Sequence, residues 1–189
     1  YLTDTALNAV LDAQMVFGGH GYIREWGMEQ CVRDLRISQI YEGTNGVQAQ
    51  DLIGRKTIRN NGANMAEYIT EIREFVATLD DSLAIKAATL NACSEVEAIT
   101  QFILQQAKEA PGVAVDYLHA VGLLSFSYMF AKIAQAAQGK TETFYQNKVI
   151  LAQYFAEKVL PGLTARIAQI KAGSNLMMQL PEDYFTAQS

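Results

Sequence analysis

Apolar residues recur at intervals of three and four along most of this 189-residue chain, and this spacing constrains the fold more than any other feature. The stripe Met65, Ile69, Ile72, Val76 and Leu79 is the clearest example. Residues at this spacing share one face of an α-helix, whereas a half-buried strand alternates apolar and polar residues. No alternation of useful length occurs, and only 3 prolines interrupt the chain. The pattern predicts an all-α protein made of helical bundles.

Turn-forming residues between the apolar stripes predict where the helices begin and end. Asn60-Asn61-Gly62 is the clearest break, because polar turn formers followed by glycine suit the end of a helix. We therefore expect one domain over residues 1–60 and a second, a helical bundle, over residues 61–189. The expected helices are 1–17, 28–40, 44–59, 65–79, 80–109, 115–137, 141–159 and 163–172.

Two prolines refine these expectations. Pro111-Gly112 is expected to stop the helix of residues 80–109, and Pro161 to kink or end the helix before it, because proline lacks the N–H donor and clashes one turn back. The tail after Gly173 contains several apolar residues, among them Leu176, Tyr184 and Phe185, and is apolar enough to dock on another surface.

Composition excludes several classes of function. The formal net charge is -5 and Lys and Arg do not cluster, which argues against nucleic acid as a partner. Cys31 and Cys93 lie in apolar helical patterns and are expected to be buried free thiols. Since no metal-ligand spacing links them to the two histidines, no metal site is expected. Residues 113–137 are the most hydrophobic, but polar and charged residues interrupt them, which favours a bundle helix over a membrane span.

Two short stretches near the start of the chain could carry chemistry. The first is the glycine-rich turn Phe17-Gly18-Gly19-His20-Gly21-Tyr22, and the second is Ile40-Tyr41-Glu42-Gly43-Thr44-Asn45-Gly46-Val47-Gln48. Taken alone, the first reads as an ordinary helix-ending turn and Glu42 as a solvated charge at a helix end. Thr44 can cap the following helix, because its hydroxyl can accept a bond from a free backbone N–H.

Together and in this order, the two stretches resemble the C-terminal helical domain of the acyl-CoA dehydrogenases. The resemblance implies that Glu42 is the catalytic base, which removes the α-proton of an acyl-CoA thioester while the β-hydrogen leaves as hydride to FAD. It also implies that the backbone N–H of Glu42 polarises the thioester carbonyl. An apolar site that excludes water would raise the pKa of such a glutamate towards the working pH.

The resemblance implies roles for five further residues. Thr44 would contact FAD, and the backbone of Gly18 and Gly19 would lie against the FAD of a neighbouring subunit. Tyr41 and Gly43 flank the base on the substrate side. The chain departs from the family pattern at two FAD-contacting positions, where Met15 and Gly46 stand in place of residues such as glutamine.

Asn45-Gly46 resembles the larger bacterial acyl-CoA dehydrogenases, which carry a helical C-terminal extension matching residues 61–189. The family's complete subunit also has an N-terminal helical domain and a middle β-domain. Because the chain opens at Tyr1 within an apolar periodic run and has no initiator Met or charged leader, we expect a C-terminal fragment of a longer protein. We expect the isolated fragment to bind FAD weakly or not at all and to be inactive.

The same resemblance implies partners and a location. The full-length parent would act in β-oxidation on acyl-CoA, pass electrons to an electron-transfer flavoprotein, and form a dimer or tetramer in the cytoplasm. An acyl-CoA oxidase, which uses the same base and flavin, remains an alternative. A second is that residues 61–189 form a non-enzymatic module for oligomerisation or partner binding. A third, a DNA-associated relative, is disfavoured by the acidic balance.

Overall fold

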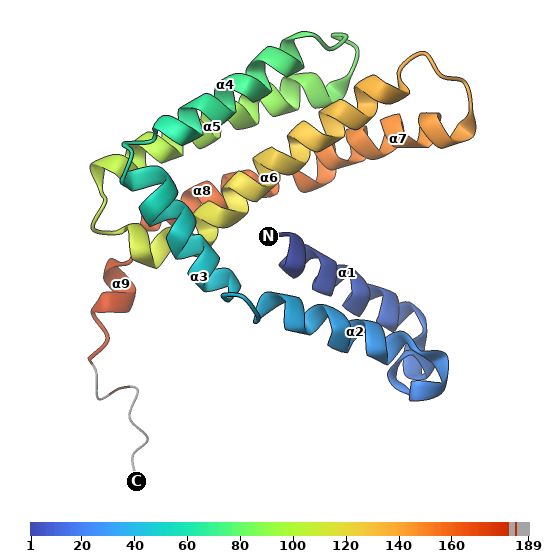
Figure 1. The fold of residues 1–189 in the computed structure, drawn as a ribbon, viewed down its shortest axis with the longest axis horizontal. Helices are drawn as coiled ribbons and strands as arrows, with labels where there is room; N and C mark the ends of the chain where they lie inside the picture. The colour runs from blue at the N-terminus through green and yellow to red at the C-terminus, as the bar shows by residue number, and fades with distance from the viewer. Residues whose placement is uncertain (182–183, 185–189) are drawn as a thin grey trace. The chain divides into compact units, whose positions relative to one another are not determined.

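The computed structural model describes residues 1–181 and 184, and within them every regular element is helical. The predicted all-α fold is confirmed. The chain divides into two compact units, one over Tyr1–Ala49 and one from Gln50 onward. In Figure 1 the colour runs from blue at the N-terminus, where the first unit lies, to red at the end of the second unit.

The first unit is a pair of helices joined by tight turns. Helix α1 (Leu2–Val16) and helix α2 (Met28–Arg36) pack side by side (Figure 1), with 3₁₀ turns at Gly18–Tyr22 and Arg24–Trp26 between them. A further 3₁₀ turn, Ile37–Gln39, follows α2. The helix expected over residues 28–40 therefore ends earlier, because the chain tightens before the Glu42 loop.

The second unit is a helical bundle with its own core. Its helices are η4 (Asp51–Ile58), α4 (Ala63–Ala77), α5 (Ala84–Gln105), α6 (Ala110–Ala137), α7 (Thr143–Tyr154), η5 (Phe155–Val159), α8 (Gly162–Ala172) and α9 (Asn175–Met178). Helix α3 (Asn45–Gln50) runs directly into η4, whose hydrogen bonds have π-helical spacing. Tyr184 is described, and Phe185 of the expected docking tail lies outside the described residues.

The turn at Asn60-Asn61-Gly62 lies inside the second unit. Asn61 and Gly62 have φ angles of 54° and 78°, which end η4 and let α4 turn back. Because η4 packs on α4, α5 and α6, the division between compact units falls at Ala49, before this turn. The domain boundary at residue 60 stays a prediction.

Pro111 has the opposite role to the one expected. It does not stop the preceding helix, which ends at Gln105, but lies in the first turn of α6. Proline is tolerated there, since the first N–H groups of a helix have no partner within it. Pro161 does end a helix as expected, because η5 finishes at Val159 and α8 begins at Gly162.

The start of α5 also differs from the expectation. The helix begins at Ala84 rather than Asp80. The Asp80 carboxylate accepts a hydrogen bond from the backbone N–H of Ser82 at 2.8 Å, and such local bonds compete with helical pairing.

Helix α6 is the core of the bundle. It packs against α5, α7 and α8, and Figure 1 shows it running along α7 and α8. By length and composition it could cross a membrane, but twelve of its residues are buried within the bundle. Asp116 on α6 also pairs with Arg166 on α8 at 2.9 Å. These features match the bundle helix that the sequence predicted.

A buried polar contact fastens η4 to this core. The Tyr117 hydroxyl lies 2.9 Å from Thr100 Oγ1, and Tyr117 is fully buried. Burial raises the pKa of Tyr117, against the opposing effect of hydrogen bonds with Thr100 and Thr57. Each threonine also donates to a backbone carbonyl of its own helix, Val96 and Leu52 respectively. Three helices therefore meet at one tyrosine.

We expect Tyr117→Phe to lower the free energy of unfolding by about 1 kcal/mol, the usual value of one buried hydrogen bond. The change deletes a single oxygen and preserves the ring, so packing is retained. Urea denaturation measures the effect, and Tyr154→Phe is the matched control because Tyr154 is 59 % exposed. Equal midpoints for the two variants would contradict the prediction.

Candidate active site

The loop that carries Glu42 has an unusual backbone. Glu42 has a φ angle of 54° and Gly43 one of 93°, so both lie in the left-handed region. Within the described residues, Asn61 is the other non-glycine residue there, and asparagine adopts this conformation far more readily than glutamate. Backbone strain of this kind persists only when surrounding contacts hold it, and it concentrates at functional sites.

Helix α3 supplies two of the contacts that hold this loop. The side-chain amide of Gln48 donates to the Glu42 carbonyl at 3.2 Å. The Thr44 hydroxyl accepts the backbone N–H of Val47 at 3.3 Å, which confirms the predicted cap. The loop is therefore tied to the first turn of the helix that follows it.

Helix α1 supplies a third contact through Asp4. The Asp4 carboxylate oxygen Oδ1 accepts a bond from Gln39 Nε2 at 2.5 Å and another from Asn45 Nδ2 at 2.6 Å. Asn45 Oδ1 in turn accepts the Thr3 hydroxyl at 3.0 Å. Because Gln39 and Asn45 precede and follow Glu42, one carboxylate fixes both ends of the loop.

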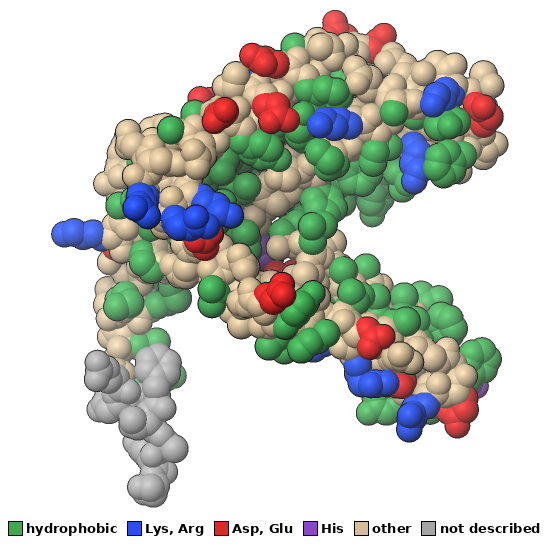
Figure 2. Space-filling model, in the orientation of Figure 1, with side chains coloured by type: hydrophobic (Ala, Val, Ile, Leu, Met, Phe, Trp, Pro, Cys, Tyr) green, Lys and Arg blue, Asp and Glu red, His purple; other side chains and the backbone are tan. Residues whose placement is uncertain are grey.

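The side chains of the motif are open to solvent in the described chain. Tyr41, Glu42, Gly43 and Thr44 are all exposed, Tyr41 by 55 %. Apolar side chains cover much of the visible surface of α1 and α2 in Figure 2. Within the first unit the buried residues are Gly21 and Ala49. The unit thus presents the loop without enclosing it.

The glycine pair lies at the other end of α1. Gly18 has a φ angle of 60°, and a side chain added at Gly18 or Gly19 would meet no atom within 4 Å. A hollow of about 320 Å³ is lined there by Gln14, Met15, Gly18 and Tyr22. The backbone at the pair is therefore accessible beside an apolar surface.

Two residues in this region clarify the departures from the family pattern. The Gln14 side-chain amide donates to the Gly21 carbonyl at 3.0 Å, so it stabilises the turn. Met15 is 79 % exposed and offers an apolar side chain where many family members have a glutamine. Gly46, the second departure, is exposed in the first turn of α3.

The structure does not bring all the predicted residues together. Tyr41, Glu42, Gly43 and Thr44 form one loop near the start of α1, whereas Gly18 and Gly19 follow its last residue. Because α1 has 15 residues, its length separates the two groups by about 22 Å. Within this chain they form two places rather than one site.

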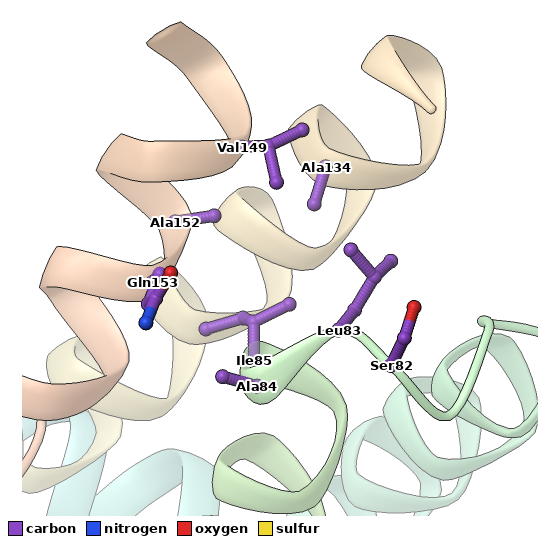
Figure 3. Close-up of a pocket in the computed structure, with 8 residues that line it drawn as sticks. All are labelled: Ser82, Leu83, Ala84, Ile85, Ala134, Val149, Ala152 and Gln153. Carbon is purple, nitrogen blue, oxygen red and sulfur yellow. The ribbon is translucent and has the colours of Figure 1, made fainter. Parts of the chain in front are cut away.

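Among its described residues, the second unit offers no comparable set of reactive groups. Figure 3 shows a small hollow of about 100 Å³ where the start of α5 meets α6 and α7. Its lining is apolar apart from Ser82 and Gln153, with no acid or base. In the described part of the chain, no group of three His, Cys, Asp or Glu residues could hold a metal ion.

The two cysteines differ, contrary to the expectation that both are buried. Cys93 is fully buried on α5, but Cys31 is exposed on α2. Cys31 was wrongly assigned because the periodicity of α2 predicts which face is apolar and not whether another element covers it.

Comparison with known proteins identifies the family. Residues 1–58 match the model of the acyl-CoA dehydrogenase C-terminal domain, and residues 68–181 match a model described as acetyl-CoA dehydrogenase C-terminal like. The chain belongs to the acyl-CoA dehydrogenase family. The two matched regions leave residues 59–67 between them, around the turn at Asn60-Asn61-Gly62.

Several curated relatives are similar along nearly the whole chain. The broad-specificity linear acyl-CoA dehydrogenase FadE5 of Mycobacterium tuberculosis is 28 % identical over 97 % of this chain and 33 % of the relative. A butyryl-CoA dehydrogenase of Syntrophomonas wolfei is 25 % identical over 98 % and 33 %. The 3-methylmercaptopropionyl-CoA dehydrogenase of Ruegeria pomeroyi is 30 % identical over 90 % and 31 %. The chain spans about a third of the length of these relatives.

Sequence reasoning missed Asp4 and the role of Gln48. Gln48 belongs to the recognised stretch, but its position six residues after Glu42 does not show that its amide reaches back. Asp4 stands within an apolar periodic run, where it reads as an ordinary first-turn acid of a helix. Its pairing with residues 35 and 41 positions away depends on how the helices pack.

We expect the isolated chain to show one fast-reacting and one slow-reacting thiol at pH 8. Burial raises the pKa of the Cys93 thiol from 9.0 to about 11, so its reactive thiolate is about 10²-fold scarcer. A chromogenic disulfide reagent should therefore label Cys31 first and Cys93 only on unfolding. Cys31→Ser should abolish the fast phase, whereas a fast phase lost in Cys93→Ser would reverse the assignment.

Proposed function

We propose that the protein to which this chain belongs is an FAD-dependent dehydrogenase that converts acyl-CoA thioesters to trans-2-enoyl-CoA, as in β-oxidation. The observation that carries the proposal is the strained, braced loop that presents Glu42 within the region matching the family's C-terminal domain. A glutamate held in a costly conformation by contacts from two helices fits a catalytic role better than that of a solvated surface charge.

In this proposal Glu42 is the base. Its carboxylate takes the α-proton of the thioester, and bound FAD supplies the acceptor for the β-hydrogen that leaves as hydride. The backbone N–H of Glu42 donates to the thioester oxygen, where negative charge develops as the proton leaves. Gly43 leaves the substrate side of the loop without a side chain, and Tyr41 adds an aromatic ring beside it.

The chain offers two places that fit parts of FAD. Thr44 uses its oxygen as an acceptor for Val47, and its hydroxyl proton remains able to donate to the cofactor. At Gly18 and Gly19 the accessible backbone and the hollow lined by Met15 and Tyr22 suit an aromatic or ribityl surface. In this proposal the two places, which lie about 22 Å apart along α1, contact different FAD molecules, and the subunit is part of a homo-oligomer, either a dimer or a tetramer.

Acyl-CoA is the substrate class that the relatives share. Their names specify linear acyl, butyryl and 3-methylmercaptopropionyl thioesters, which differ in the acyl chain and agree in the CoA thioester. Because all three are named dehydrogenases, we favour an electron-transfer flavoprotein over oxygen as the acceptor. The rate of flavin reoxidation by each acceptor distinguishes a dehydrogenase from an oxidase.

The second unit supports a second, non-catalytic role. Its outer surface carries exposed apolar residues on α6 and α7, including Met129, Ile133, Phe144, Leu151 and Tyr154, and surfaces of this kind serve protein contacts. We infer that this bundle contributes to subunit or partner contacts while the first unit contributes to catalysis.

We expect Glu42→Gln in the FAD-loaded full-length protein to slow flavin reduction by about 10²–10⁴-fold or more, the usual contribution of a general base. The variant preserves the shape of the side chain and removes its basicity. Anaerobic mixing with a panel of acyl-CoA thioesters measures the bleaching of the flavin absorbance. Equal bleaching in both proteins would place the base elsewhere.

A second expectation concerns the chain by itself. Since the Glu42 loop and the Gly18 hollow are both open to solvent, we expect the isolated chain to bind FAD weakly or not at all and to show no dehydrogenase activity. Titration with FAD followed by flavin fluorescence tests this. Purification of a yellow chain with one FAD per molecule would overturn it.

A further inference from the structure

We propose that Gln48 is a positioning residue that holds the left-handed conformation of Glu42 and so directs the Glu42 carboxylate. This inference rests on the proposed function, in which Glu42 is the base. Gln48 reaches back from the first turn of α3 and donates to the Glu42 carbonyl oxygen at 3.2 Å. No other side-chain hydrogen bond within the described loop is made to the backbone of Glu42.

The conformation at Glu42 has a cost that some contact must offset. A non-glycine residue in the left-handed region loses about 1–2 kcal/mol relative to the ordinary helical region, and glutamate has no short side chain to compensate by a local bond. The hydrogen bond from Gln48 acts on the peptide that joins Glu42 to Gly43. It therefore restrains ψ of Glu42, one of the two backbone torsions that set the direction of the Glu42 side chain.

Gly43 is shaped to admit the Gln48 amide. A Cβ built on Gly43 would lie 3.1 Å from Gln48 Nε2 and 3.5 Å from Val47 Cγ1. The first of these contacts is tighter than usual and would displace the amide by a few tenths of an ångström. The φ angle of 93° at Gly43 is itself unfavourable for residues other than glycine. The need for glycine at this position thus has a cause within the chain, beside any need for space around the substrate.

Other hydrogen bonds hold the ends of the loop and the backbone of Gln48 in place. Asp4 binds Gln39 and Asn45, which sets the two ends of the loop, and the Gln48 backbone N–H donates to the Thr44 carbonyl at 3.0 Å. Asp4 sets where the loop lies, whereas Gln48 sets how its central peptide is turned. Catalysis depends on that turn, because a displacement of about 1 Å can cost about 10²-fold in rate.

The test is Gln48→Met in the FAD-loaded full-length protein, which keeps the length of the side chain and removes the donor. We expect kcat for flavin reduction to fall by about 10–100-fold while KM and FAD content change little. Gln30→Met is the matched control, because Gln30 lies on α2 and its amide bonds within its own helix to Asp34; it should keep the parent rate. Gln48→Lys retains a donor of similar reach and should recover part of the rate.

Two further measurements separate the positioning role of Gln48 from the role of Glu42 as base. In a Glu42→Gln background, Gln48→Met should add no further loss, since both changes act through one group; multiplied losses would overturn the inference. A crystal structure of the Gln48→Met protein should show residue 42 outside the left-handed region. Retention of that region, or an unchanged kcat, would also overturn it.

The proposed function can fail separately. If Glu42→Gln keeps the parent rate, Glu42 is not the base, and both the proposed function and the catalytic part of this inference are wrong. If Glu42→Gln abolishes reduction and Gln48→Met does not affect it, the proposed function stands and the inference about Gln48 alone is wrong.

Discussion

The second unit depends on the burial of helix α6. Small residues recur along its buried face, among them Ala114, Ala120, Ala131 and Ala134, and they let α5, α7 and α8 approach closely. Large residues between them fill the remaining space, and Tyr117 adds the contact that holds η4. The stability of the bundle therefore rests on the close packing of these helices around α6.

The first unit is built differently. Its apolar residues follow helical periodicity, yet most of them, such as Met15, Trp26 and Ile40, are exposed. Its conformation relies on polar contacts instead: the Asp4 carboxylate, the Gln48 amide and the Thr44 cap. Polar contacts fix direction at short range but contribute little net stability each, whereas apolar burial supplies most of the free energy of folding. A unit of this kind suits a surface that becomes enclosed when cofactor, substrate and further protein assemble on it.

Periodicity predicted the all-α fold and most helices, because the same spacing that marks an apolar face also fixes the element type. Periodicity gave the wrong prediction where one residue type is compatible with two structural positions. The sequence predicts Pro111 to stop a helix, but proline is equally common in the first turn of a helix. Only the backbone hydrogen bonds of the neighbouring helices distinguish the two positions. The sequence likewise predicts Cys31 to be buried, but an apolar helix face is buried only where another element covers it.

The residues of the candidate site could also be predicted only in part. Motif order pointed to Glu42, Thr44 and the glycine pair, and family models matched the region in which they lie. No property of the sequence indicates that Asp4 binds residues on both sides of the loop. Gln39 and Asn45 are 35 and 41 positions away from Asp4, and these hydrogen bonds depend on how α1 packs against α2. Nor does it indicate the φ angle of 54° at Glu42, since glutamate disfavours that region. A residue that adopts a conformation its type resists must be held there by others, and the hydrogen bonds of Gln48 and Asp4 are the contacts that hold the loop around Glu42.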